Sequence, residues 1–139
     1  MSIKVNDLRI GNLLRVIESK EVITIEFINN LIEDGNFSIG YKTGNGDKVF
    51  KRISELEPID FKNDLDKYGF TDHLLLSELK EDNNNILIEI NEHGFMLYKC
   101  DNGYRYINLT HERFKTFLHL LQNQYYFVTG KELDVSNIK

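Results

Sequence analysis

The chain has 139 residues, a formal net charge of −5 and 41% hydrophobic side chains. This length and hydrophobic content suffice for one domain or two small lobes with a core, and they exclude collagen, disulfide-rich scaffolds and disordered linkers. The acidity is spread evenly, whereas charge-driven nucleic-acid binding needs clustered Lys and Arg, so we expect no nucleic-acid binding by direct electrostatics.

Alternating apolar residues predict short β-strands in the first half of the chain. Ile23, Ile25 and Phe27 alternate with polar residues, which is the period-two pattern of a strand with one buried face. Asn45 and Gly46 favour the positive backbone dihedrals of a tight hairpin turn. The strands are expected at 13–17, 23–27, 37–41 and 49–53.

These strands are too few for an open sheet with its own core, and curling into a closed barrel also removes exposed strand edges. We therefore predict that residues 6–58 form a small SH3-like antiparallel β-barrel, within a first lobe that spans 1–58. Pro58 marks the end of this lobe because proline lacks the N–H group that a sheet ladder needs. Residues 59–139 are assigned to a second, α+β lobe, and the two lobes are expected to form one compact unit.

The second lobe is predicted to begin with a short helical segment that Gly69 terminates. Residues 71–81 fit either a helix or a buried strand. Three alternating segments then predict a β-meander at 86–90, 95–100 and 104–109. Its tyrosines are expected to pack across the strands rather than to stack on RNA bases, because the glycine-aromatic motif and the basic flanks of an RNA-reading sheet are missing. These tyrosines are Tyr98, Tyr104 and Tyr106.

A long C-terminal helix is predicted between a capping Thr110 and the terminating Gly130, with about eighteen residues, or roughly 27 Å. Apolar residues at three- and four-residue spacings give it one buried face. The expected fold is therefore α+β, with an SH3-like β-barrel lobe followed by a β-meander packed on one long helix. The buried face of the helix consists of Phe114, Phe117, Leu118, Leu121, Tyr125 and Val128.

The chain carries four sequence blocks: LRIGN at 8–12, EPI at 57–59, GF at 69–70 and HLLQNQYYFVTGKEL at 119–133. In combination these blocks resemble a family of small proteins from Bacteroidota and from their phages and mobile elements. Phe127 departs from the family pattern, which has a small residue at that position. The resemblance implies a bacterial or phage origin and supports the predicted fold, and it transfers no functional residue to this chain.

No constellation of side chains points to catalysis or to a bound metal. The serines lack the context of a nucleophile elbow, and the single cysteine, Cys100, can form neither an intramolecular disulfide nor a thiolate zinc cluster. We predict no catalytic residue, no cofactor and no metal, and we expect that the protein is not an enzyme. The chain has four histidines, and no two of them have the i, i+4 spacing of a helical zinc site. They are His73, His93, His111 and His119.

Three local features bear on partners and compartment. The densest basic group, formed by Lys48, Lys51 and Arg52, is expected to be the solvated end of a hairpin rather than a phosphate site. Apolar runs stay short, as at 74–76, so we expect no membrane span. The N-terminus lacks the pattern of a signal peptide, and a cytoplasmic location is expected.

The side of the predicted C-terminal helix opposite its buried face carries an unusual mixture of residues. With Phe114 at 0° and 100° per residue, four polar or aromatic residues fall between about 120° and 180°, and two apolar ones near 220–240°. A simple surface helix would not place phenylalanine and leucine there. Either a second layer, from the first lobe or a dimer partner, covers this side, or the residues form a partner-binding ridge. These residues are Glu112, His119, Leu120, Asn123, Tyr126 and Phe127.

These observations favour a non-enzymatic binding or adaptor protein that acts through protein–protein contacts, with a homodimer as one form of such contact. The alternative is a phage-encoded inhibitor of a host defence nuclease or nucleotide signal, because an acidic surface can occupy a site meant for nucleic acid. Neither hypothesis involves a membrane.

Overall fold

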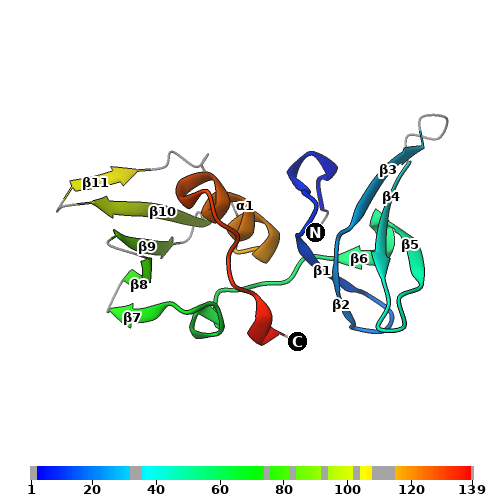
Figure 1. The fold of residues 1–139 in the computed structure, drawn as a ribbon, viewed down its shortest axis with the longest axis horizontal. Helices are drawn as coiled ribbons and strands as arrows, with labels where there is room; N and C mark the ends of the chain where they lie inside the picture. Colours follow the sequence, from blue (N-terminus) through cyan, green and yellow to red (C-terminus); the bar gives the residue numbers. More distant parts are fainter. Residues whose placement is uncertain are drawn as a thin grey trace. The chain divides into compact units, whose positions relative to one another are not determined.

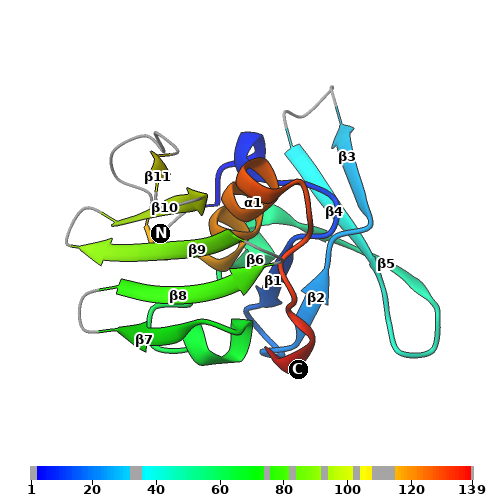
Figure 2. The same ribbon diagram turned by 60° about the vertical axis from the view of Figure 1, so that its left-hand side comes forward.

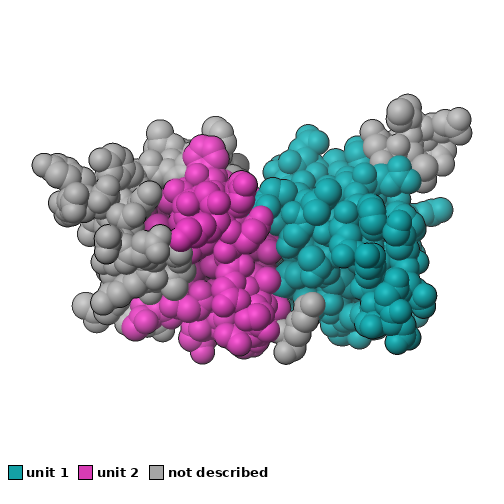
Figure 3. All heavy atoms as spheres, in the orientation of Figure 1, with its two compact units in different colours: residues 1–59 teal, residues 60–139 magenta. Residues whose placement is uncertain are grey.

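The chain is an α+β protein with several small antiparallel sheets and one α-helix near the C-terminus among the described residues (Figure 1). The computed structural model describes residues 3–31, 36–73, 76–81, 84–91, 94–101, 104–107 and 115–138. It divides into two compact units, Met1–Ile59 (unit 1) and Asp60–Lys139 (unit 2), shown in Figure 3. The sequence analysis placed this boundary after Pro58.

Unit 1 contains two three-stranded antiparallel sheets. The first sheet has the order β2-β1-β6, with bounds Val22–Thr24, Leu13–Val16 and Leu56–Glu57. The second has the order β3-β4-β5, with bounds Phe27–Leu31, Asn36–Lys42 and Lys48–Arg52. Two short 3₁₀ helices, η1 (Val5–Asp7) and η2 (Ile53–Glu55), flank the strands. Across the described residues, no ladder closes the two sheets into a barrel.

The chain passes from one sheet to the other at Ile25 and Glu26. The N–H of Ile25 donates to the carbonyl of Asn12 (2.9 Å), which extends the β1–β2 ladder. The N–H of the next residue, Glu26, donates to Gly40 of the second sheet (2.9 Å). The single strand predicted at 23–27 is therefore wrong: two strands meet at a corner, because the hydrogen-bonding partner changes there.

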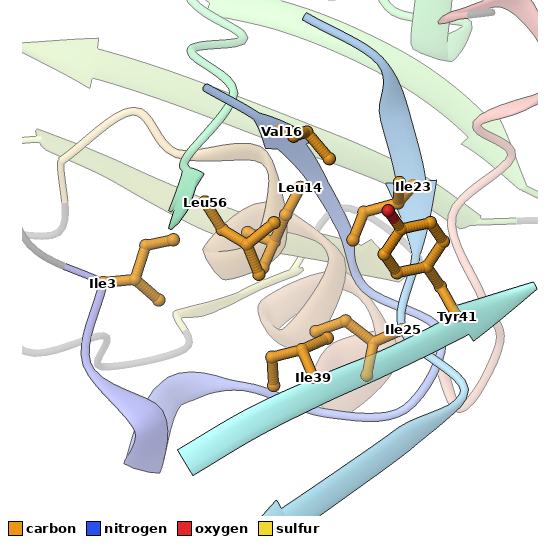
Figure 4. Packing of buried hydrophobic residues seen from close by; sticks show 8 residues of the cluster. All are labelled: Ile3, Leu14, Val16, Ile23, Ile25, Ile39, Tyr41 and Leu56. Carbon is orange, nitrogen blue, oxygen red and sulfur yellow. The ribbon is translucent and has the colours of Figure 1, made fainter. Parts of the chain in front are cut away.

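The core of unit 1 lies between its two sheets (Figure 4). β1 and β2 contribute aliphatic side chains from one sheet, and β4 contributes Ile39 and Tyr41 from the other. Each fully buried large side chain contributes about 1.5–3 kcal/mol to folding. The buried cluster consists of Ile3, Leu14, Val16, Ile23, Ile25, Ile39, Tyr41 and Leu56.

The predicted hairpin turn between β4 and β5 is confirmed, but of Asn45 and Gly46 only Gly46 has a positive φ. Gly46 has a φ of +85°, a conformation that glycine adopts without steric cost. Its N–H donates to the carbonyl of Thr43 (2.9 Å), and the N–H of Thr43 donates to Asp47 (2.9 Å). This turn sets the register in which Lys42 pairs with Lys48.

Unit 2 contains a five-stranded antiparallel sheet with the order β11-β10-β9-β8-β7 (Figure 2). The predicted meander is confirmed as its last three strands. Residues 71–81, which fitted a helix or a strand, contribute two strands to the sheet. The bounds are Thr71–His73 for β7, Leu76–Glu81 for β8, Asn84–Asn91 for β9, Gly94–Asp101 for β10 and Tyr104–Ile107 for β11.

A 3₁₀ turn, η3 (Leu65–Tyr68), precedes this sheet and confirms the short helical segment predicted there. Gly69 ends it in the left-handed conformation, with a φ of +89°. Leu65 and Tyr68 of this turn are buried. A further 3₁₀ turn, η4 (Ser136–Ile138), lies near the C-terminus.

The C-terminal helix α1 (Leu118–Thr129) has 12 residues and is shorter than predicted. Its start is the reason: Phe117 is extended, with φ −88° and ψ 133°, and forms an antiparallel bridge with Asp60. Thr110 and Phe114 lie outside the described residues. The predicted end is confirmed, since Gly130 has a φ of +75°. None of the helices within the described ranges has the length and apolar character needed to cross a membrane.

Candidate functional site

Two neighbouring aromatic side chains are exposed on the last turn of α1. Phe127 exposes 76% of its surface and Tyr126 exposes 45%. The turn is well defined: the N–H of Gly130 donates to the carbonyl of Tyr126 (2.7 Å), and the Thr129 hydroxyl donates to Tyr125 (2.8 Å). A defined backbone holds these rings at the surface, so they can contact a partner with little loss of backbone entropy.

The other described residues of the ridge predicted on this helix are buried or half-buried. His119 and Leu120 expose only 1% and 8% of their surface, and Asn123 is half-buried. Glu112 lies outside the described residues. The assignment of His119 and Leu120 as partner-binding residues is therefore wrong, because the first turn of α1 is buried around its whole circumference from Leu118 to Gln122.

Contacts within unit 2 hold the start of α1. The N–H of Phe61 donates to the carbonyl of Thr116 (2.9 Å), and the Thr116 hydroxyl donates to Oδ1 of Asp60 (2.8 Å). Phe61 in turn packs edge-on against Phe95 of β10, with ring centroids 5.2 Å apart. Segment 60–61 therefore connects the start of the helix to the sheet. The ring of His119 stacks on Phe117, with centroids 5.8 Å apart, and takes part in this packing.

The described residues offer no metal centre: among them, no group of three or more His, Cys, Asp or Glu side chains could hold an ion. His93 and His111 lie outside the described residues.

The tyrosines of the meander do not share one cross-strand row, since Tyr98 pairs with Ile107 whereas Tyr106 pairs with Lys99. The hydroxyl of Tyr98 instead donates to the carboxylate of Glu89 (2.6 Å).

A pocket of about 370 Å³ lies on unit 1, beside β6 and η2. Its wall is mainly apolar, and Glu57, one of the lining residues, forms an ion pair with Lys20 (3.2 Å). A small apolar group could enter it, and its lining includes no pair of groups suited to acid–base chemistry. The pocket is lined by Ile3, Ile17, Ile53, Ser54, Leu56, Glu57 and Pro58.

A second exposed aromatic pair lies on the outer side of sheet β3-β4-β5, which the sequence analysis did not single out. Phe27 of β3 and Phe50 of β5 both pair with Gly40 of β4, so the three residues form one cross-strand row. The sequence did contain a signal for Phe50, since Lys48 and Arg52 flank it at two-residue spacing. It contained none for Phe27, whose alternation with Ile23 and Ile25 predicted the buried side.

Among the described residues, Tyr41 and Asp134 have shifted pKa values. Burial raises the pKa of the Tyr41 phenol, and the Glu21 carboxylate adds to this rise. Hydrogen bonds from Ser136 lower the pKa of the exposed Asp134 carboxyl, the side-chain bond more than the backbone bond. Both shifts have local structural causes.

In comparisons with known proteins, no family model, no curated protein and no solved structure matches the chain.

Proposed function

We propose that this chain is a non-enzymatic binding protein of a bacterium, phage or mobile element, and that it acts in the cytoplasm through protein–protein contacts. The observation that carries the proposal is the exposure of Phe127 beside Tyr126 on a turn that hydrogen bonds define. Large aromatic residues are the commonest energetic centres of protein interfaces, because they bury much surface and lose little side-chain entropy.

We further propose that unit 1 is an SH3-like module. Two antiparallel sheets around one core support this proposal, as does the segment that bends from one sheet into the other at Ile25 and Glu26. In this arrangement unit 1 is a compact scaffold, and the protein contact belongs to α1 of unit 2.

The alternative function is inhibition of a host defence nuclease or of a nucleotide signal. The net charge of −5 favours it, because an acidic protein can occupy a basic site that normally takes nucleic acid. In that case the partner recovered would itself be a nuclease or a nucleotide-binding protein.

The test compares the wild-type protein with Tyr126→Ser/Phe127→Ser, and uses Ile10→Ser as the matched control. Ile10 is also an exposed apolar residue, but it lies on unit 1. Each tagged protein is incubated with host cytosol, and the retained proteins are quantified by mass spectrometry. If the aromatic pair is the centre of an interface, its removal costs about 2 kcal/mol or more, which is roughly a thirtyfold loss of the partner.

The Ile10→Ser variant should retain the partner at the wild-type level. Equal recovery with all three proteins would contradict the assignment of Tyr126 and Phe127. Sedimentation of the purified chain completes the test: a dimer that dissociates in the Tyr126→Ser/Phe127→Ser variant would identify the partner as a second copy.

A further inference from the structure

The outer side of sheet β3-β4-β5 combines exposed aromatic rings with positive charge. Side chains of directly paired residues in an antiparallel sheet point to the same side, so the register defines this side residue by residue. No carboxylate occurs at its paired positions in β3, β4 and β5, although the chain as a whole is acidic. We give the name aromatic–basic face to eight residues of this side: Phe27, Asn29, Ser38, Gly40, Lys42, Lys48, Phe50 and Arg52.

The two aromatic rings of this face lie over a glycine. Phe27 and Phe50 expose 36% and 51% of their surface, and their ring centroids are 6.4 Å apart with an angle of 39° between the planes. A Cβ atom at Gly40 would lie only 2.8 Å from Cε1 of Phe50 and 3.0 Å from Cβ of Phe27. The missing side chain therefore lets the rings lie over the middle strand and leaves part of each ring exposed to solvent.

Positive charges lie on both sides of the aromatic row. Lys42 and Lys48 form the neighbouring row on one side, and Arg52 belongs to the row on the other side. Neighbouring rows on one side of a strand are two residues, or about 6.6–6.8 Å, apart. Nζ of Lys48 lies 4.4 Å from the centroid of the Phe27 ring, so this cation also contacts the aromatic surface.

Within the described residues none of these three cations forms an ion pair, and the Glu55 carboxylate accepts a hydrogen bond from the backbone N–H of Arg52 (3.1 Å). An exposed ring with phosphate-binding cations on both sides is the arrangement on which proteins stack the bases of single strands. A duplex does not fit it, since its bases are already stacked on one another. An acidic peptide would satisfy the cations but would leave the exposed rings without a partner.

We propose that the aromatic–basic face binds single-stranded RNA, with one base stacked on Phe50, the more exposed ring, and phosphates paired with the three cations. A second base stacks on Phe27 when Lys48 leaves the face of that ring to pair with a phosphate. The polar residues of the Arg52 row favour RNA over DNA. Asn29 and Ser38 both lie in this row, and their side chains can donate and accept hydrogen bonds, as the ribose 2′-hydroxyl requires. The surface belongs to unit 1, whereas Tyr126 and Phe127 belong to unit 2.

The sequence analysis expected no nucleic-acid binding, because charge is distributed evenly along the chain. The aromatic–basic face changes this expectation. Pairing of strands brings Lys42 close to Lys48 and Arg52 onto the same side, so the local charge is positive where the average charge is negative. The net charge of −5 still opposes the approach of RNA, and we therefore expect binding that falls steeply with salt concentration.

The experiment uses the full chain and a fluorescently labelled twelve-nucleotide oligouridine, with binding followed by fluorescence anisotropy at low salt. The wild-type protein should bind at concentrations below about 10⁻⁴ M, the weak end of sequence-independent binding. Phe27→Leu/Phe50→Leu keeps the apolar character but removes the rings, and we expect affinity to fall roughly tenfold or more.

A second pair of variants tests the charges. Lys42→Gln/Lys48→Gln should weaken binding and lower the slope of log K against log salt by about 1.4, because each phosphate contact to a single strand contributes about 0.7. Lys4→Gln/Lys62→Gln is the matched control, since it removes the same charge from exposed lysines that do not belong to this face and should leave the slope unchanged. The urea midpoint of each variant confirms that it is folded.

Several outcomes would overturn the proposal. One is the absence of wild-type binding at about 10⁻⁴ M protein, and another is unchanged affinity in Phe27→Leu/Phe50→Leu. Equal or tighter binding of oligothymidine would overturn the assignment to RNA. Equal binding of an oligoglutamate peptide or of duplex RNA would show a simple patch of positive charge. Each outcome is distinguishable from failure of the proposed protein contact, because Tyr126→Ser/Phe127→Ser should bind the oligonucleotide like the wild-type protein.

Discussion

Tyr41 is a buried phenol in the core of unit 1, and its ionisation links stability to pH. Burial raises the pKa of this phenol above its ordinary value of 10.0, and Glu21 raises it further. The folded state then holds the proton more tightly than the unfolded state, so the contribution of Tyr41 is complete below pH 10.0 and is lost as pH rises through the folded pKa.

We therefore predict that the free energy of unfolding of the wild-type protein falls more steeply above about pH 10 than that of Tyr41→Phe. Urea midpoints measured at neutral pH and at alkaline pH check this prediction. The other tyrosines are present in both proteins, so the difference between the two pH profiles isolates Tyr41. Parallel profiles would show that this phenol ionises equally well in the folded and unfolded states.

Single residues of the candidate site were predictable only where local geometry decided their position. The predicted outward direction of Tyr126 and Phe127 is confirmed by their exposure. The same angular argument was wrong for His119 and Leu120, because an angle about the helix axis gives a direction and does not say what covers the side chain. Burial of the first turn of α1 depends on tertiary contacts that no periodicity encodes.

At the level of elements, Gly130 controls the end of α1. Its φ of +75° is a conformation that costs a residue with a side chain about 1–2 kcal/mol. A Cβ atom there would meet no other atom within 4 Å, so the cost of Gly130→Ala is purely conformational. We predict a loss of about 1 kcal/mol in the free energy of unfolding, measured by urea titration, and a smaller loss for Gly130→Asn.

Gly44→Ala is the matched control for Gly130→Ala. A Cβ at Gly44 also meets nothing within 4 Å, and Gly44 lacks a positive φ, so the substitution should change stability by less than about 0.5 kcal/mol. Equal effects of Gly44→Ala and Gly130→Ala would mean that the left-handed end of α1 does not limit stability.

The elements themselves were predictable to different degrees. Alternation located β4, β9 and β10 correctly, because it reflects the two sides of a strand directly. The start of α1 and the corner at Ile25 and Glu26 were not predictable, since both depend on partners distant in sequence. Phe117 is extended where it bridges Asp60, and Glu26 donates to Gly40 instead of continuing the β1–β2 ladder.

At the level of the whole molecule, the core of unit 1 consists of residues from unit 1 alone. We predict that residues 1–59 fold independently and unfold cooperatively, with marginal stability for a domain of this size. Leu14→Ala removes a fully buried side chain and should cost about 2–5 kcal/mol, enough to unfold the fragment. Circular dichroism during heating and dispersed amide NMR signals measure both outcomes.

Ile10→Ala provides the control for this prediction, because Ile10 is an exposed aliphatic residue of the same unit. It should leave the fragment folded. A fragment without dispersed amide signals, even in its wild-type form, would show that unit 1 needs unit 2 in order to fold.

The sequence by itself determined the α+β class, the meander and the positions where chain segments turn or end, at Gly46, Gly69 and Gly130. These features are local: strand alternation and positive φ angles depend on a few neighbouring residues. Only the tertiary structure decided that Phe27 joins Phe50 over Gly40, that three cations gather around them, and that Leu120 is buried while Phe127 is exposed. Pairings between residues far apart in the chain produce these features, and the order of residues along one segment does not reveal such pairings.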